Sequence, residues 1–364
     1  MSPFCSATGP AASARRASTA WGNEPRFVLV HDFDRDGKDD LLTANNAGNN
    51  LTFRKGDGAG SLRPPGFFPV DPVSHAAGGD FNGDGRADLA VAAQSGIFIL
   101  LGTGNESFRL GSKLPLGAFT YVAVVDFNGD ARQDLAASSP TQGIRVGLGD
   151  GAGGFGPFTR KDPVSPLPAP FVPAAARSIA VADFNADGNA DIAGAAGGRI
   201  SILLGDGKGD FATSEVAVEG RQISVITADL NRDSKGDVVA LSDRSDITVL
   251  LGDGTGKFST PVAVGSVLSQ RSSDNVQSMA AGDLDGDGNV DLVFPDNSQF
   301  SPITGPKGQA VVYLGNGAGG SGRRSPTRST GTSIGRPSPT STGTANSTSP
   351  SPEGVRQSAP SRCS

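Results

Sequence analysis

The stretch GGDFNGDGRADLAVAA, residues 78–93, sets acidic or amide side chains at alternate positions, then a glycine, another aspartate and an apolar run. Six segments share this pattern: DFDRDGKDDLL from Asp32, DFNGDGRADLAV from Asp80, DFNGDARQDLAA from Asp126, DFNADGNADIAG from Asp183, DLNRDSKGDVVA from Asp229 and DLDGDGNVDLVF from Asp283. Successive copies start 48, 46, 57, 46 and 54 residues apart. Self-similarity at such a period indicates a solenoid, a propeller or another repeat array.

A second, glycine-rich phrase keeps step with the first. Its copies are KGDGAGSL at Lys55, LGTGNESF at Leu101, LGDGAGGF at Leu148, LGDGKGDF at Leu204, LGDGTGKF at Leu251 and LGNGAGGS at Leu314. Short β-rich runs such as YVAVV and ITVLLG lie between the phrases, and four such strands with their turns fill a unit of this length. The chain has 52 glycines, 25 prolines and no amphipathic helical stretch. It is therefore predicted to be all-β, a β-propeller of four-stranded blades with six repeats visible.

The two ends do not fit the repeat. We expect residues 1–20 to be a disordered N-terminal segment, residues 21–320 to form the propeller and residues 321–364 to be a disordered tail. The tail has six arginines, one glutamate, no aromatic residue and mostly Ser, Thr, Pro and Gly. Ser321 stands where earlier copies have a phenylalanine, so the sixth blade is expected to be cut short. The tail could be a linker or the product of a shifted reading frame.

Composition excludes several classes of protein. No run reaches the roughly 18 apolar residues that cross a bilayer, and residues 1–20 lack the apolar core of a secretory signal. The two cysteines, Cys5 and Cys363, lie in the atypical ends, so the repeats use neither disulfides nor thiol chemistry. We also expect no nucleic-acid partner and a monomer.

The first phrase has the form Asp-x-Asp/Asn-x-Asp-Gly-x-x-Asp. Side-chain oxygens at positions 1, 3, 5 and 9 and the carbonyl at position 7 can converge on a hard cation, and glycine at position 6 permits the sharp turn. Calcium is the expected ion, up to six in all, because magnesium demands tighter octahedral geometry. The predicted ligands are Asp32, Asp34, Asp36, Asp40, Asp80, Asn82, Asp84, Asp88, Asp126, Asn128, Asp130, Asp134, Asp183, Asn185, Asp187, Asp191, Asp229, Asn231, Asp233, Asp237, Asp283, Asp285, Asp287 and Asp291.

Position 6 departs from glycine twice, at Ala131 and Ser234. A left-handed backbone costs a residue with a side chain roughly 1–2 kcal/mol, so these two loops are expected to bind calcium most weakly. The net charge agrees with metal binding: the chain carries −6 and its two ends +2 and +5, so residues 21–320 carry −13. Six divalent ions would nearly neutralise that charge.

Three other interpretations of these phrases fit the sequence less well. An EF-hand or dockerin loop needs glutamate at position 12 and flanking helices, whereas Val91 stands there in the second copy. Asx-rich turns without metal would not require the ninth aspartate. The Gly-Asp-Gly phrases resemble phosphate-binding loops, but no Gly-Lys-Ser/Thr follows and Asp57, Asp150, Asp206 and Asp253 would repel phosphate. Tight hairpin turns are the better interpretation.

These motifs resemble the FG-GAP repeat, also known as the VCBS repeat, and the calcium-bearing blades of the integrin α-subunit propeller. The resemblance covers roughly residues 25–320. The Phe-Gly and Gly-Ala-Pro motifs that give the family its name are poorly matched, and Phe155-Gly156 comes nearest to them. The resemblance implies an extracellular or cell-surface, adhesion-type module that binds proteins or glycans. The family usually closes seven blades, so an incomplete ring, a six-bladed closure and a missing seventh blade stay open.

Loop lengths suggest where a partner binds. In a four-stranded meander the predicted calcium loops and the Gly-Asp-Gly turns share one face, and all other loops lie on the opposite face. The long segments 165–178, 265–278 and 295–309 fall on that opposite face, with Phe171, Arg271 and Phe300 as candidate contacts. The alternative is that these segments are merely tolerated insertions.

Catalysis has little support in the sequence. The two histidines, His31 and His75, precede calcium loops and suit structural roles, and the only tyrosines are Tyr121 and Tyr313. We expect no enzyme activity and a structural role for calcium. The alternatives are a propeller-based carbohydrate-active enzyme such as a polysaccharide lyase, and an inert architectural segment of a larger secreted protein.

Overall fold

The computed structural model describes residues 25–104, 107–162, 178–266, 279–296, 300–301, 305–306 and 309–327. The chain divides into two compact units, Met1–Arg328 and Ser329–Ser364, and every described residue belongs to the first. The described residues form strands and turns without a helix, and a search of them finds no helix able to span a membrane. The predicted N-terminal segment and most of the predicted tail lie outside the described residues.

Four sheets contain four strands each, and in each the strands follow chain order and pair antiparallel. The first holds β1 (Pro25–His31), β2 (Asp40–Asn45), β3 (Asn50–Arg54) and β4 (Gly66–Pro69); the second β5 (Val73–Gly79), β6 (Asp88–Ala93), β7 (Gly96–Gly102) and β8 (Phe108–Leu114); the third β9 (Tyr121–Val125), β10 (Asp134–Ser139), β11 (Gly143–Gly147) and β12 (Thr159–Arg160); the last β19 (Ala280–Gly282), β20 (Asp291–Asp296), β23 (Gln309–Gly315) and β24 (Ser321–Thr327). A separate hairpin joins β21 (Phe300–Ser301) to β22 (Gly305–Pro306).

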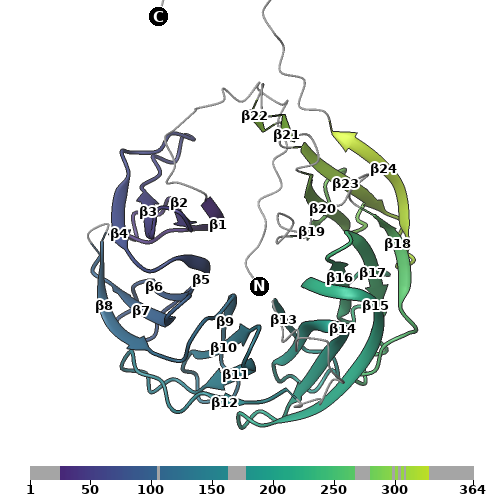
Figure 1. The fold of residues 1–364 in the computed structure, drawn as a ribbon, viewed down its shortest axis with the longest axis horizontal. Helices are drawn as coiled ribbons and strands as arrows, with labels where there is room; N and C mark the ends of the chain where they lie inside the picture. The colour runs from purple at the N-terminus through teal and green to yellow at the C-terminus, as the bar shows by residue number, and fades with distance from the viewer. Residues whose placement is uncertain are drawn as a thin grey trace, which may run out of the picture. The chain divides into compact units, whose positions relative to one another are not determined.

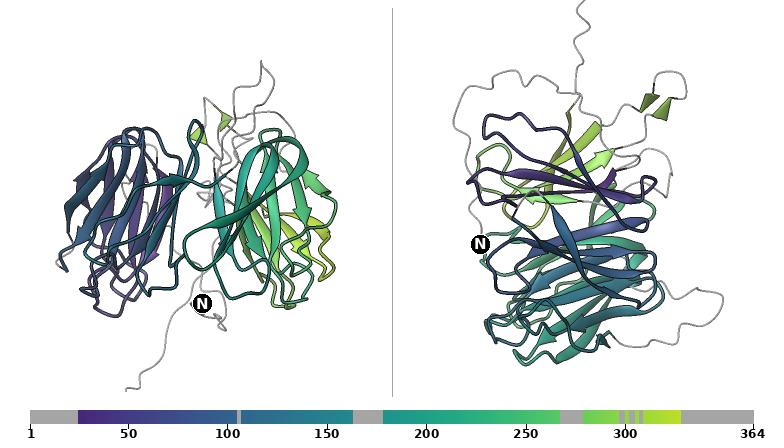
Figure 2. Two further views of the ribbon diagram at one scale, coloured as in Figure 1. Left: turned by 90° about the horizontal axis from the view of Figure 1, so that it is seen from below. Right: turned by 90° about the vertical axis from the view of Figure 1, so that its left-hand side faces the viewer.

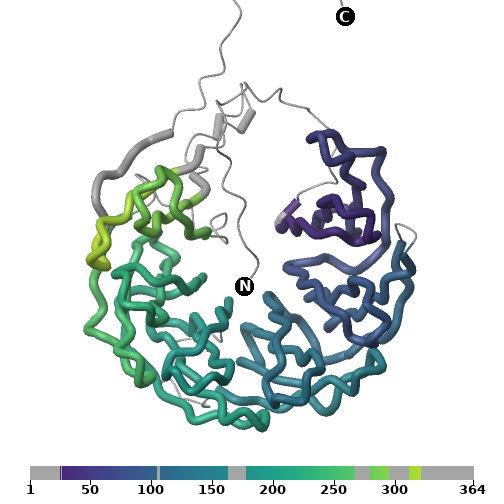
Figure 3. Tube along the Cα trace, turned by 180° about the vertical axis from the view of Figure 1, so that it is seen from behind, coloured from purple at the N-terminus to yellow at the C-terminus, as the bar shows by residue number. Residues whose placement is uncertain are grey.

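The sheets stand side by side around a ring (Figure 1). The first strand of each sheet lies nearest the centre and the fourth lies outermost, as the tube in Figure 3 also shows. Seen from the side, the strands run between two faces of the ring, where the connecting loops gather (Figure 2). The fold is therefore the predicted all-β propeller.

The fourth and fifth repeats share one six-stranded sheet, so the ring has five blade sheets rather than the six separate blades expected. Its strands are β13 (Ile179–Ala182), β14 (Asp191–Gly205), β15 (Phe211–Ala228), β16 (Asp237–Ser242), β17 (Asp246–Leu250) and β18 (Val262–Ser266). β15 serves as the last strand of one repeat and the first of the next, with an irregular register between Gln222 and Ser224. The corresponding link in the second repeat contains Pro115, which ends its strand, and β15 contains no proline.

The last repeat is not cut short at Ser321. β24 pairs with β23 from Gly315↔Ser321 to Ala310↔Thr327, which completes a four-stranded sheet. The predicted tail boundary was therefore too early. Backbone pairing needs no particular side chain, so the absent phenylalanine did not prevent the strand from forming.

The hydrophobic core lies between consecutive repeats. Five clusters of buried residues each join one repeat to the next. We call the nine-residue aspartate segments, predicted to bind metal, the metal loops. The aromatic residue at position 2 of a metal loop packs edge-on against the phenylalanine after the next repeat's turn, as in Phe81 with Phe155 (5.4 Å between centroids) and Phe184 with Phe258 (5.4 Å). Each repeat thus depends on its successor to bury its position 2 side chain.

None of these clusters of described residues joins the last repeat to the first. Leu284, at position 2 of the last loop, is 56% exposed, whereas Phe81 in the second loop is 2% exposed. The first sheet is polar on the face turned away from the second, where Asn45 Nδ2 donates to Thr52 Oγ1 (2.7 Å) and Thr43 Oγ1 donates to Asn45 Oδ1 (3.2 Å). The two ends of the array therefore differ in polarity.

Candidate metal centre

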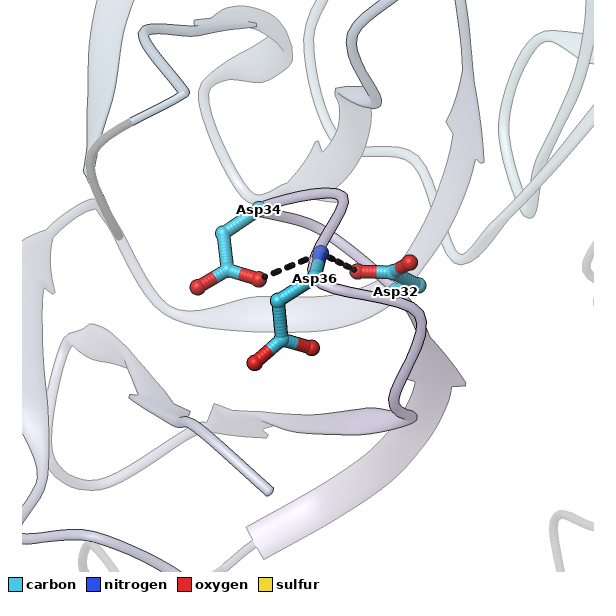
Figure 4. Close-up of side chains that lie close together, drawn as sticks. All are labelled: Asp32, Asp34 and Asp36. Carbon is cyan, nitrogen blue, oxygen red and sulfur yellow. Dashed lines mark hydrogen bonds between the residues drawn. The ribbon is translucent and has the colours of Figure 1, made fainter. Parts of the chain in front are cut away.

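The six aspartate loops share one hydrogen-bond pattern. In every copy the backbone N–H at position 6 donates to the position 1 carboxylate at 2.7–2.9 Å. The N–H at position 7 donates to the position 5 carboxylate at 2.7–3.0 Å. Figure 4 shows the first loop, where the N–H of Asp36 lies between the carboxylates of Asp32 and Asp34. These bonds hold the carboxylates of positions 1 and 5 against the backbone of the loop.

The loop needs a left-handed backbone at two positions. Position 6 has φ between 63° and 84° in all six copies, including 64° at Ala131 and 63° at Ser234. Position 4 is also left-handed, with φ between 58° and 79°, and is filled by Arg35, Ala186 and Arg232 in three copies. The strain anticipated at position 6 is present, and the strain at position 4 was missed because the motif leaves that position unspecified.

The ninth aspartate is buried and joins the loop to the glycine-rich turn. Its Oδ2 accepts the N–H of position 2 at 2.8–3.0 Å in all six copies. Its Oδ1 accepts the N–H of the first glycine of the turn at 2.7–2.9 Å. These side chains are at most 1% exposed. The sequence analysis predicted a metal ligand at this position, which stays a prediction, and missed these structural hydrogen bonds.

Burial raises the pKa of five ninth aspartates, and their backbone donors only partly offset it; the five are Asp40, Asp88, Asp134, Asp191 and Asp237. A raised pKa here means that burial disfavours the charged carboxylate, and the neighbouring loop aspartates add a smaller repulsion. A cation beside these carboxylates would favour their charged form.

The first glycine of each turn lies directly against the metal loop. A Cβ atom there would come within 2.0–2.4 Å of the backbone oxygen at loop position 8, in all six copies; the glycines are Gly56, Gly102, Gly149, Gly205, Gly252 and Gly315. No side chain fits at that distance. The glycine of the Leu-Gly word is thus required by the close approach of the loop and its turn.

The Gly-Asp-Gly phrases are tight turns, as predicted. Asp150 Oδ1 accepts the N–H groups of Ala152 (2.7 Å) and Gly154 (2.9 Å), and these bonds lower the pKa of Asp150. Asp57, Asp206 and Asp253 accept corresponding bonds. The turn also touches the preceding repeat, where Gly153 N–H donates to the Phe81 carbonyl at 2.8 Å. Loops and turns therefore share one face.

Two observations test whether a cation fits these loops. Carboxylate oxygens of Asp32, Asp34 and Asp36 lie within 4.8 Å of one another, and those of the last loop's three corresponding aspartates do so too. In the second loop Asp80 Oδ1 is buried and has no hydrogen-bond donor. A buried carboxylate oxygen without a donor is costly, and a bound cation would compensate it. The donor set is all oxygen, which suits calcium.

The first loop differs from the others because a lysine reaches it. The Lys55 ammonium donates to Asp34 Oδ2 and lies 3.1 Å from Asp36 Oδ2. This contact lowers the pKa of Asp36, and both carboxylates raise the pKa of Lys55. The other five repeats have leucine at this position.

The two histidines and two tyrosines make packing or hydrogen-bond contacts with neighbouring residues. The His75 ring stacks on Tyr121 (3.7 Å between centroids) and lies against Phe27 (4.1 Å). Burial lowers the pKa of His75 to about 3, so it is neutral at physiological pH. Tyr313 Oη donates to the Ser266 carbonyl at 2.8 Å, and His31 packs edge-on against Phe33.

The predicted partner loops are largely untested by the structure. Most of segments 165–178 and 265–278, with Phe171 and Arg271, lie outside the described residues. In segment 295–309 the backbone of Phe300 belongs to β21, which pairs with β22.

Comparison with known families identifies the class of the protein. The model of the FG-GAP-like repeat matches five times, over residues 32–91, 80–137, 126–194, 183–240 and 229–294. Each match runs from one metal loop into the next, and together they cover more than half of the chain. The chain belongs to the FG-GAP-like repeat family. A search of curated protein sequences finds no match.

Solved structures agree on the fold. A lectin from Agrocybe aegerita, described as specifically recognising non-reducing terminal N-acetylglucosamine, is 19% identical over 84% of this chain and 81% of its own, with a TM-score of 0.56. BBS1N, solved in complex with ARL6DN, is 16% identical over 80% of this chain and 79% of its own, with a TM-score of 0.52. At these identities the likeness shows the propeller fold alone.

Proposed function

We propose that this protein is a calcium-stabilised, extracellular binding module without catalytic activity, whose ligand is a glycan or a protein. The observation that carries the calcium part is the buried Asp80 Oδ1, which has no donor inside a loop of otherwise satisfied carboxylates. The other five loops share the backbone bonds from positions 6 and 7, although there the position 1 Oδ1 accepts a backbone N–H. Calcium would offset the mutual repulsion of the carboxylates and fix the innermost strand of each repeat to the second.

Counting the bound calcium ions tests whether the loops bind calcium. The full chain, freed of metal and titrated with calcium, is expected to bind several ions in native mass spectrometry and calorimetry. Asp80→Asn should remove or weaken one site, because an amide oxygen replaces the buried carboxylate oxygen. Asp39→Asn, an exposed position 8 residue, is the matched control and should leave the count unchanged. Failure of the wild-type chain to bind calcium at millimolar concentration would refute the proposal.

Ligand binding is the second part. The lectin relative binds terminal N-acetylglucosamine and BBS1N binds a protein, so propellers of this fold serve both purposes. The glycan is tested first. A glycan array probed in calcium and again in chelator should give signal only with calcium. Binding to no glycan, with capture of a protein from the extracellular medium, would favour the protein ligand.

The absence of catalysis is also a proposal. The one cluster of described residues that combines histidine and tyrosine is the stack of His75 and Tyr121, whose buried rings suit packing. Hydrolysis or elimination on a polysaccharide panel, lost in Tyr121→Phe, would overturn it. Fractionation of the producing cells tests the extracellular location, and a strictly intracellular protein would contradict it.

A further inference from the structure

Lys55 departs from a rule that the other repeats obey. Leucine fills this position in the next five repeats, and in four of them it lies against the third glycine of the next repeat's turn, as Leu204 does at Gly256. In the second repeat Glu106 stands in place of that glycine. Lys55 directly follows β3, whose Arg54 pairs with Leu41 just beyond the metal loop. Its side chain thus starts beside the loop's end.

The ammonium of Lys55 contacts the carboxylates of positions 3 and 5. It donates to Asp34 and lies 3.1 Å from Asp36, and the lysine and Asp34 side chains are only 13% and 6% exposed. Lys38 also lies 3.3 Å from Asp36, but its side chain is 42% exposed. An exposed pair of that kind contributes little, whereas a shielded pair that serves two carboxylates is held much more firmly.

The last loop is the natural comparison, because it also has aspartate at positions 1, 3 and 5. Leu314 occupies the position of Lys55 there. Arg232 contacts this loop but donates to the backbone carbonyls of Asp287 (2.7 Å) and Gly288 (3.0 Å). The carboxylates of Asp283, Asp285 and Asp287 stay exposed.

We propose that Lys55 is the built-in cation of the first loop, which therefore forms without metal and binds calcium more weakly than the last loop does. The first half concerns the metal-free protein and stands on the contacts of Lys55. The second half rests on the proposed calcium function, because the ammonium and a calcium ion would compete for the same oxygens of Asp34 and Asp36.

Hydrogen exchange in chelator tests the first half. In the full chain, the amides of residues 32–40 should exchange more slowly than those of residues 283–291. Lys55→Leu, the residue of the other repeats, should speed exchange in residues 32–40 by about tenfold, because two charge-assisted contacts are lost. Lys38→Leu removes the same charge from the same loop and should change exchange by less than about twofold. Equal exchange of residues 32–40 in wild type and Lys55→Leu would overturn the proposal.

Calcium titration of the same variants tests the second half. Lys55→Leu should tighten calcium binding at the first loop by about tenfold, seen in native mass spectrometry as one more ion at limiting calcium. An unchanged count and affinity, with calcium bound elsewhere, would overturn the competition. If neither protein bound calcium but Lys55→Leu still lost its protection, the calcium function would fail and the role of Lys55 in the metal-free loop would stand.

Discussion

The first and last metal loops carry the same three leading aspartates, yet they meet different cations. In Asp32–Asp40 the ammonium of Lys55 contacts two carboxylates, whereas in Asp283–Asp291 Arg232 contacts only backbone carbonyls. Their backbones are nevertheless alike, with the same bonds from positions 6 and 7. The loop's conformation is thus set by its hydrogen bonds, and its charge is balanced separately by whatever cation lies nearest.

The largest expected effect comes from a feature that both loops share. Gly56→Ala and Gly315→Ala would each place a Cβ atom within 2.0 Å and 2.2 Å of a backbone oxygen of the loop. We expect each to reduce the free energy of unfolding by about 3 kcal/mol or more, since backbone must move. Chemical denaturation measures this. Gly282→Ala, which meets open space, should cost under about 1 kcal/mol, and equal losses in all three variants would contradict the close approach.

The ninth aspartates should give a smaller and again equal loss. Asp40→Asn and Asp291→Asn each turn one of two acceptor oxygens into a donor that faces a backbone N–H, which costs about 2 kcal/mol in the metal-free protein. Denaturation in chelator checks it. A large difference between the two variants would mean that the backbone bonds of the ninth aspartate do not stabilise the two loops equally.

Position 6 separates these two loops from the third and fifth. The first and last loops have Gly37 and Gly288 there, whereas Ala131 and Ser234 adopt φ of 64° and 63°. Ala131→Gly and Ser234→Gly should each stabilise the protein by roughly 0.5–1 kcal/mol, because strain relief exceeds glycine's entropy cost. Their calcium affinity should rise as well. Destabilisation of both variants would contradict this account of the strain.

The smallest expected effect is on the pKa of Asp36. Lys55 holds the pKa of Asp36 below its ordinary value, so the stabilisation from this contact is present above about pH 4 and is lost as pH falls through the lowered pKa. In Lys55→Leu the pKa of Asp36 should rise, while that of Asp287, lowered by hydrogen bonds from Asn289, should stay unchanged. Carbon-detected NMR titration of the metal-free protein measures both. An unchanged pKa of Asp36 would contradict the contact.

Much of the fold could be predicted from the sequence because the same turn-forming residues recur at the same positions in each repeat. The all-β class, the turns at Asp57 and Asp150 and the shared face of loops and turns follow from glycine and aspartate at fixed offsets, and all are confirmed. The merged fourth and fifth blades were missed, since no proline interrupts β15. β24 was missed because strand pairing at Ser321 uses only backbone groups.

The sequence predicted which residues form the candidate site but not the hydrogen bonds and ion pairs between them. The motif predicted the ninth aspartates as ligands, yet their bonds to the turn glycine link residues 14 to 24 positions apart, as in Asp134 and Gly149. Lys55 appeared in the sequence only as a substitution in a turn phrase. Its role needs the three-dimensional proximity of β3 and the first loop, which no local pattern contains.

Thermal unfolding of the full chain in millimolar calcium and in excess chelator tests the central claim most directly. The account predicts that chelator lowers the melting temperature by about 10 °C or more, because ions that bind only the folded state each add to its stability. Magnesium should restore little of that loss. An identical melting temperature in calcium and chelator would contradict the claim that cations hold these loops.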